Sequence, residues 1–251
     1  MNKEEQLLEK RLIELSNLAF SRDIVVFSDF LNLNDLNILH RIPKDLLSAR
    51  FETYGGYKLA ERQMVAFLPD ALYYDYRYPM QALEIHPANK RFAEDLTHRD
   101  YLGSLMNLGT TRSKIGDIIL SDDGAIVFVK DEISDYIVNS LTRIRHTTVT
   151  TTPKELSDIS YEPHFDELKG TVPSVRLDTV LSVAYPLSRS KLTAYIEAAK
   201  VFVNGKLITN NGYHLKEGDL ISVRGLGRIA YTGILSETKK GRYMISLRKY
   251  I

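Results

Sequence analysis

The chain has 251 residues, 44% hydrophobic and 26% charged, a composition typical of a folded globular protein large enough for two or three compact units. It has no cysteine, so disulfides and thiolate sites are excluded. It has no run of about 18 apolar residues, and its charged start MNKEEQLLEKRLIEL has no apolar signal-peptide core, so we expect a cytoplasmic protein without a membrane span. The net charge is +1, but the charges are unevenly distributed. Residues 170–251 carry 13 Lys and Arg and 5 Asp and Glu, whereas residues 1–169 carry 20 Lys and Arg and 27 Asp and Glu. This asymmetry predicts a polyanion-binding module attached to an acidic body.

Residues 1–75 are predicted to form a small domain of helices and strands. Apolar residues at the helical period indicate an amphipathic helix over 5–20, and RQMVAFLP (62–69) indicates a strand that ends at its proline. Gly55-Gly56 marks a turn before this strand. A glycine pair can also cradle a phosphate, but no glycine-rich fingerprint surrounds this one, and we favour a plain turn.

Residues 76–165 carry the pattern of a ferredoxin-like sandwich. The expected elements are, in order, a strand at 81–87, a helix at 97–109, strands at 114–120 and 125–130 joined by the hairpin turn SDDG, a helix at 132–147 and a strand at 148–153. Thr97 is the expected N-cap of the first helix. The order β-α-β-β-α-β predicts a four-stranded sheet with both helices on one face.

RNA-recognition modules share this layout, but their stacking aromatic residues are missing here. The third strand offers only Phe128, without the basic and aromatic pattern that stacks bases. A structural or protein-contact role for this sheet is at least as well supported as base stacking. Arg143, Arg145 and His146, at the expected end of the second helix, suit the helix dipole, and we favour that role over a phosphate contact.

The segment LKGTVPSV (168–175) is predicted to be a linker, punctuated by Gly170 and Pro173. A helix then begins near Leu177, and a second helix begins after Ser188 as its N-cap, with Leu192, Ile196 and Ala199 facing inward. The stretch VFVNGKLI indicates a strand, a turn at Asn204-Gly205 and the start of a second strand, and GDLISVRG indicates a later strand. Alternation in the tail KKGRYMISLRKYI indicates a final ordered strand.

Arg189 and Lys191 lie in the first turn of the second helix, where the helix dipole is already positive. Positive charge there is expected if an anion docks, because helix N-termini and Arg or Lys side chains both bind phosphate. Further basic residues lie in neighbouring turns and strands and are expected to line the same groove. The candidate RNA-binding residues are Arg176, Ser188, Arg189, Lys191, Lys200, Asn204, Lys206, Arg224 and Arg228. The alternative to RNA binding is a basic face that is simply solvated.

The spacing of these residues resembles that of the S4 RNA-binding domain, a small α-α-β module of ribosomal proteins, tyrosyl-tRNA synthetases and pseudouridine synthases. The matching pieces are RLD at 176–178, Ser188-Arg189, VFVNG at 201–205 and GDLISV at 218–223. Ala199 departs from the pattern, since many members carry glycine there. The resemblance implies an S4 domain over 172–251, in which Asp178 is structural and holds Arg176 or a helix cap.

Over the whole chain the sequence resembles the YlmH family of bacterial S4 proteins, through YGGYKLAER at 54–62, LTHRDYLGSLMNLG at 96–109, RSKIGDI at 112–118 and the S4 module. The resemblance implies an α+β protein of three domains, at 1–75, 76–165 and 172–251, the second of RNA-recognition-like topology. It further implies binding to the large ribosomal subunit, through rRNA and obstructing peptidyl-tRNA, in ribosome-associated quality control. Family members are encoded near cell-division genes.

Enzyme motifs are weak in this sequence. HRD at 98–100 is similar to a kinase catalytic loop, but Asn107 is misplaced and no glycine-rich loop accompanies it. RLDT at 176–179 is similar to the catalytic segment of pseudouridine synthases but opens the S4 helix instead. The six histidines lack metal-ligand spacing, so we expect no metal, cofactor or small-molecule substrate. A non-catalytic RNA-binding protein is favoured; the alternatives are an RNA-modifying enzyme, such as a pseudouridine synthase relative, and an RNA-linked adaptor in cell division.

Overall fold

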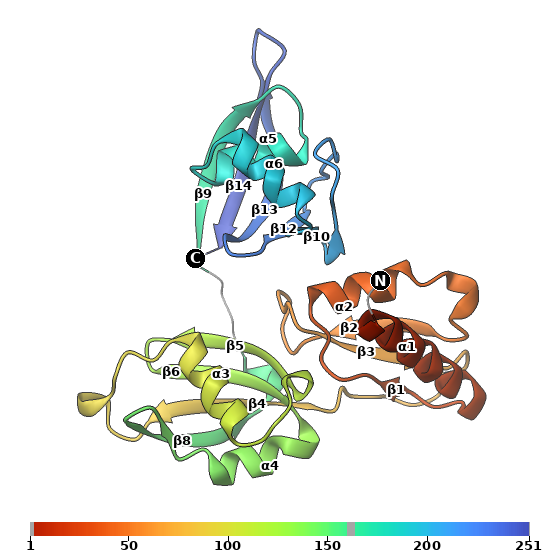
Figure 1. Cartoon of the computed structure of the whole chain (residues 1–251), viewed down its shortest axis with the longest axis vertical. Coiled ribbons are helices and arrows are strands. Elements are labelled where there is room, and N and C mark those ends of the chain that lie inside the picture. The colour runs from red at the N-terminus through yellow and green to blue at the C-terminus, as the bar shows by residue number, and fades with distance from the viewer. Residues whose placement is uncertain (1–2, 160–163, 251) are drawn as a thin grey trace. The chain divides into compact units, whose positions relative to one another are not determined.

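The computed structural model describes residues 3–159 and 164–250, which divide into two compact units, Met1–Tyr161 and Glu162–Ile251 (Figure 1). Helices and strands are mixed along both units, and the strands form one sheet of three, one of five and one of six strands. The expected α+β class is confirmed. No helix within the described ranges has the length and apolarity needed to cross a bilayer.

The first sheet lies near the start of the first unit. Its elements are α1 (Lys3–Arg22), β1 (Val26–Phe27), α2 (Leu33–Arg41), a 3₁₀ turn (Lys44–Leu46), β2 (Arg50–Tyr54) and β3 (Met64–Leu68). The strand order is β1-β3-β2, and every residue of the central strand β3 is buried. Both helices cover one face of this sheet, where Leu12 and Leu39 pack against Phe67. The predicted helix at 5–20 and strand near 62–69 are confirmed.

The second sheet has the expected ferredoxin-like order. Its elements are β4 (Met80–Pro87), a 3₁₀ turn (Lys90–Phe92), α3 (His98–Asn107), a 3₁₀ turn (Arg112–Lys114), β5 (Ile115–Ser121), β6 (Gly124–Lys130), α4 (Asp131–Ser140), β7 (Arg143–Ile144), β8 (Thr147–Lys154) and a 3₁₀ turn (Leu156–Asp158). The strand order is β5-β6-β4-β8-β7, so the four predicted strands lie in the expected order and the short strand β7 extends the sheet to five strands. Leu105 of α3 and Ile137 of α4 pack in one core with Leu83 and Val127, so both helices cover one face.

The second helix of this sandwich is shorter than predicted. It ends at Ser140, and Arg143 and Ile144 pair with β8 instead, with Arg145 in the left-handed region at φ +53°. Arg143, Arg145 and His146 therefore belong to a hairpin rather than to a helix end. The apolar spacing of Leu141 and Ile144, both buried, fits either a helix or a hairpin, and such short runs are ambiguous by periodicity.

The other face of the five-stranded sheet is covered by residues of the same unit. Phe128 on β6 is fully buried in a cluster with Phe30 and Met64, and the Tyr57 ring stacks on it with centroids 5.3 Å apart. Gly56 packs so closely that a Cβ there would lie 2.3 Å from the Phe128 ring. The two sheets of this unit thus share a core, and their division into two domains at residue 75 stays a prediction.

The described residues of the second unit, 164–250, form one six-stranded sheet and two helices. Its elements are β9 (Phe165–Val172), α5 (Leu177–Ala184), α6 (Arg189–Glu197), β10 (Val201–Val203), β11 (Lys206–Leu207), β12 (Leu220–Val223), β13 (Gly227–Glu237) and β14 (Tyr243–Tyr250), in the strand order β11-β10-β12-β13-β14-β9. Val180 and Leu192 of the helices pack with Ile221, Ile229 and other core residues on one face of the sheet. The predicted helices and the ordered final strand are confirmed, except that α6 ends at Glu197, so Ala199 lies beyond the helix and not on its inward face.

The predicted linker at 168–175 is wrong over most of its length. Residues 165–172 form β9, which pairs antiparallel with the whole of β14. Gly170 lies inside this strand because α5 packs close to it: a Cβ there would come within 2.6 Å of Val183. The glycine that resembled a linker signal therefore permits a close strand–helix contact.

Candidate nucleic-acid interface

The carboxylate of Asp178 joins the N-terminal ends of α5 and α6. Its side chain is only 4% exposed. It accepts hydrogen bonds from Nε and Nη2 of Arg176, at 3.1 and 2.8 Å, and from Nε and Nη2 of Arg189, at 3.1 and 2.5 Å. The expected role of Asp178 in holding Arg176 is confirmed, and the bond to Arg189 adds a link that the sequence analysis did not include.

The two arginines keep this buried carboxylate ionised. Burial opposes ionisation of Asp178, but the hydrogen bonds from Arg176 and Arg189 outweigh it and lower the pKa of Asp178 below its ordinary value. The same contacts raise the pKa of Arg176. Two cations share one anion, so the cluster keeps one net positive charge, and the side chains of Arg176 and Arg189 are 38% and 57% exposed. The positive charge at the start of α6 is therefore tolerated partly because Asp178 neutralises it within the chain.

Ser188 and Lys191 complete the start of α6. The Ser188 hydroxyl accepts the backbone N–H of Lys191 at 3.4 Å, so Ser188 is the predicted N-cap. Lys191 is exposed and forms no ion pair with any described residue. Its ammonium group is thus available, beside the positive end of the helix, for an external anion.

Lys200 and Arg224 are neighbours in the backbone but point to different sides of the sheet. The N–H of Arg224 donates to the carbonyl of Lys200 at 2.9 Å. The Lys200 ammonium lies 5.1 Å from the centre of the Tyr195 ring on α6, whereas the Arg224 guanidinium lies 5.3 Å from that of Phe202. Phe202 alternates with the core residues Val201 and Val203, so it faces away from the helices.

Asn204 shapes a turn rather than presenting a free amide. With Gly205 it connects β10 and β11 at left-handed φ values of +49° and +78°. Its side-chain amide donates to Asp219 at 2.8 Å, and its carbonyl oxygen accepts the N–H of Leu220 at 2.9 Å. Lys206 follows on β11, an edge strand, and is exposed.

Arg228 lies on the face of the sheet opposite to the helices. It pairs with Ser222 across β12 and β13, and the next residue, Ile229, faces the core. The nine candidates therefore do not line one groove as expected. Arg176, Ser188, Arg189, Lys191 and Lys200 lie on or next to the helices, whereas the side chains of Arg224 and Arg228 are directed to the far face of the sheet.

Tyr195 was missed as a candidate. Its ring contacts Lys200, and it follows Lys191 by four residues, which places the two side chains on one face of α6. That spacing was visible in the sequence, but a tyrosine in a short helix is equally typical of a core position.

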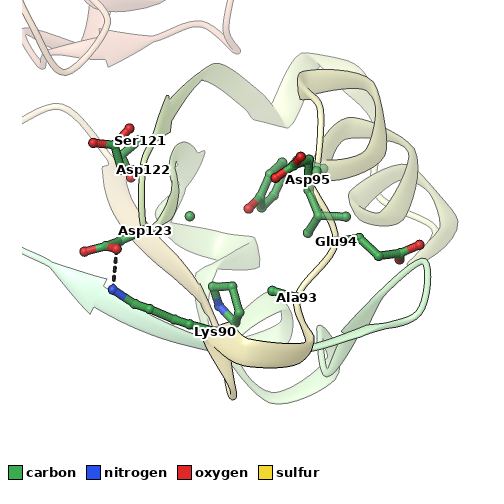
Figure 2. Close-up of a pocket in the computed structure, with 11 residues that line it drawn as sticks. Lys90, Ala93, Glu94, Asp95, Ser121, Asp122 and Asp123 are labelled. Atoms are coloured by element: carbon green, nitrogen blue, oxygen red, sulfur yellow. Dashed lines mark hydrogen bonds and ion pairs between the residues drawn. The ribbon is translucent and has the colours of Figure 1, made fainter.

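A recess of about 390 Å³ in the first unit has the wrong charge for RNA (Figure 2). Figure 2 shows Lys90 paired with Asp123, and Glu94, Asp95 and Asp122 also line the recess, with the Glu94 carboxylate directed outward to accept the N–H of His146. Four carboxylates against one lysine repel phosphate. In the described part of the chain no group of three His, Asp or Glu residues is placed to hold a metal ion.

Family models match a segment of each unit. Residues 75–158 match the family model described as "Putative RNA-binding domain in YlmH", and residues 175–221 match the S4 domain. The chain is 28% identical over 249 residues to the "Ribosome-associated protein quality control protein P2" of Bacillus subtilis (strain 168), covering 98% of this chain and 96% of that protein. The structure of the "Cell division protein ylmH from Streptococcus pneumoniae" shares the fold, with a TM-score of 0.51 and 20% identity over 63% of this chain and 95% of that one.

Proposed function

Because the chain belongs to the YlmH family of S4-domain RNA-binding proteins, we propose that it binds the large ribosomal subunit and acts, without catalysing a reaction, in ribosome-associated quality control. Its ligands there are rRNA and peptidyl-tRNA, and a ribosome-bound role places it in the cytoplasm. The similar Bacillus protein, which carries ribosome-associated quality control in its name, supports this assignment.

The observation that carries the proposal is the surplus positive charge at the start of α6. Arg176 and Arg189 share the single carboxylate of Asp178, and Lys191 lies next to them without a carboxylate partner among the described residues. Fixed cations at a helix N-terminus bind phosphate oxygens, and contacts of this kind recognise structured RNA by shape and backbone rather than by sequence.

All nine candidate residues are proposed as RNA contacts, in two groups. Arg176, Ser188, Arg189, Lys191 and Lys200 form the primary surface, on or next to the helices. Asn204, through the backbone of its turn, and Lys206, Arg224 and Arg228 extend contacts around the edge of the sheet at β10 and β11. The first unit carries the excess of acidic residues, so we assign it to positioning rather than to bulk RNA affinity.

The test is sedimentation of cell lysate through a sucrose gradient, comparing wild type with Arg189→Ala/Lys191→Ala. Wild type is expected to travel with the large subunit together with tRNA, and the double variant to stay at the top. Lys239→Ala/Lys240→Ala is the matched control, because it removes the same charge from the turn between β13 and β14 and should sediment as wild type. Wild type remaining at the top at low salt would overturn the ribosome assignment.

Two other functions are distinguished by further readouts of the same strains. A modified base found in rRNA or tRNA only when the wild-type protein is present would indicate an RNA-modifying enzyme. Localisation at the division septum that survives Arg189→Ala/Lys191→Ala would indicate a division adaptor for which RNA is incidental.

A further inference from the structure

One face of α6 and the residues flanking it form a recess of about 460 Å³ in the second unit. It is lined by Leu187, Lys191, Ala194, Tyr195, Ala198 and Lys200. Four of these follow one another at the spacing i, i+3, i+4 and i+7, which places them on a single helix face. The two alanines leave the space between the longer side chains open, while Leu192 and Ile196 on the opposite face are buried in the core.

The recess combines an aromatic ring with two lysines and has no carboxylate in its lining. Within the described residues neither Lys191 nor Lys200 forms an ion pair, and the Lys200 ammonium lies 5.1 Å from the centre of the Tyr195 ring. The nearest acid on the helix, Glu197, accepts a hydrogen bond from Asn211 at 3.1 Å. Being two residues from Tyr195, it lies on another face of the helix.

The turn that ends α6 holds the ring and the Lys200 ammonium together. The N–H of Lys200 donates to the carbonyl of Tyr195 and the N–H of Ala199 to that of Ile196, both at 3.1 Å. This is the bonding pattern of a Schellman motif. In that motif the side chains at the positions of Tyr195 and Lys200 are commonly in contact. The ring and the charge are therefore in place before a ligand arrives, which lowers the entropy lost on binding.

An aromatic ring and an apolar floor between two cations suit a nucleotide within a strand, which has a flat base and, on its sugar, a phosphate on either side. We propose that the recess holds one unpaired nucleotide of the bound RNA, with its base against Tyr195 and its flanking phosphates near Lys191 and Lys200. Single-stranded bases stack on aromatic side chains, whereas bases inside a duplex cannot reach them. The volume lies within the usual range of small-ligand sites, about 300–1,000 Å³. The inference rests on the proposed RNA-binding function and adds a preference for bulged or single-stranded nucleotides.

The test compares the affinity of the full chain for two RNA probes, a blunt duplex and the same duplex with one bulged nucleotide. Wild type should prefer the bulged duplex, and Tyr195→Leu should lose that preference with a drop of roughly tenfold. Tyr195→Phe should keep it, because the ring remains. Ala194→Leu, which fills the recess at an exposed helix position, should act like Tyr195→Leu. Tyr73→Leu, at a fully accessible tyrosine of the first unit, is the control and should bind as wild type.

The outcomes separate this inference from the proposed function. If Tyr195→Leu and Ala194→Leu bind both probes as wild type does while Lys191→Ala weakens both, the RNA-binding function stands and the nucleotide site is wrong. If wild type binds neither probe, the proposed function itself fails. If an acidic peptide displaces the bulged duplex from wild type but not from Tyr195→Leu, the recess serves a protein partner and the inference is overturned.

Discussion

The guanidinium of Arg189 donates two hydrogen bonds to one oxygen of Asp178, so the first residue of α6 is bound to the second residue of α5. Asp178 also holds Arg176, the residue that precedes α5. A single buried carboxylate thus fixes the relative orientation of two helix N-termini and the two guanidinium groups proposed to meet RNA. Loss of this carboxylate is expected to affect stability and binding together.

Asp178→Asn should destabilise the second unit by about 1–3 kcal/mol, because a buried charge-assisted network loses its acceptor. The pKa of Asp178 in the folded chain is lower than the ordinary aspartate value of about 3.9. Its contribution to stability is therefore complete above that ordinary value and is lost as the pH falls through the folded pKa. Urea unfolding at pH 7 and pH 3 should find the wild type approaching the variant at the lower pH. Equal stability of the two proteins at pH 7 would contradict this account.

Ala199→Gly should stabilise the second unit by about 0.5–1 kcal/mol. Ala199 has φ +56° at the end of α6, a conformation that costs a residue with a Cβ about 1–2 kcal/mol, part of which is offset by the greater freedom of glycine in the unfolded chain. The urea midpoint should rise with an unchanged slope. Ala198→Gly, in the last helical turn with φ −78°, is the matched control and should lower it.

Phe128→Ala should destabilise the first unit by about 3–5 kcal/mol, the usual result of emptying a buried aromatic site, without changing the salt dependence of RNA binding. The reason is that Tyr57, Phe30 and Met64 already cover the face on which a base would stack. Phe92→Ala, whose ring is 75% exposed, serves as control and should unfold as wild type. A selective loss of RNA affinity in a stably folded Phe128→Ala protein would instead support the hypothesis that bases stack on this sheet.

Lys191→Ala should reduce the slope of log affinity against log salt by about 0.9, the change for one phosphate contact. Arg228→Ala removes the same charge from the opposite face of the sheet and should change the slope less. Titrations of a structured RNA at several salt concentrations measure both slopes. Equal changes would mean that Arg228 meets phosphate as fully as Lys191 does, which would contradict the division into a primary surface and further contacts around the sheet edge.

The sequence predicted those features that depend on neighbouring residues. The cap at Ser188, the turn at Asn204-Gly205 and the helix starting at Leu177 each follow from local chemistry, and the structure contains all three. Among features set by distant pairing, the order of the four predicted strands in the first unit was predicted correctly, whereas the pairing of β9 with β14 was missed. Strand β9 was read as a linker because Gly170 resembled a break, and its partner β14 lies about 70 residues later.

The site was predicted in the same uneven way. The residue types that bind phosphate could be recognised in the sequence. The face of the sheet on which a strand residue lies depends on strand register, so the placement of Arg228 opposite the helices could not be predicted. The hydrogen bonds between Asp178 and Arg189 join residues 11 positions apart on two different helices, and no local sequence pattern predicts them.

Strand β14 lies between β13 and β9 in the six-stranded sheet. During synthesis β9 emerges first and has no partner until β14 follows, so the sheet of this unit closes last at its final hairpin. Until then both edges of β9 are unpaired and can join neighbouring chains, whereas in the finished sheet β9 is the edge strand and only its outer side is unpaired. A fragment that begins at residue 175, where the S4 match begins, lacks β9. The edge of β14 that pairs with β9 is then unpaired. Expression of the unit from residue 164 onward should therefore give a monodisperse protein where the shorter fragment self-associates.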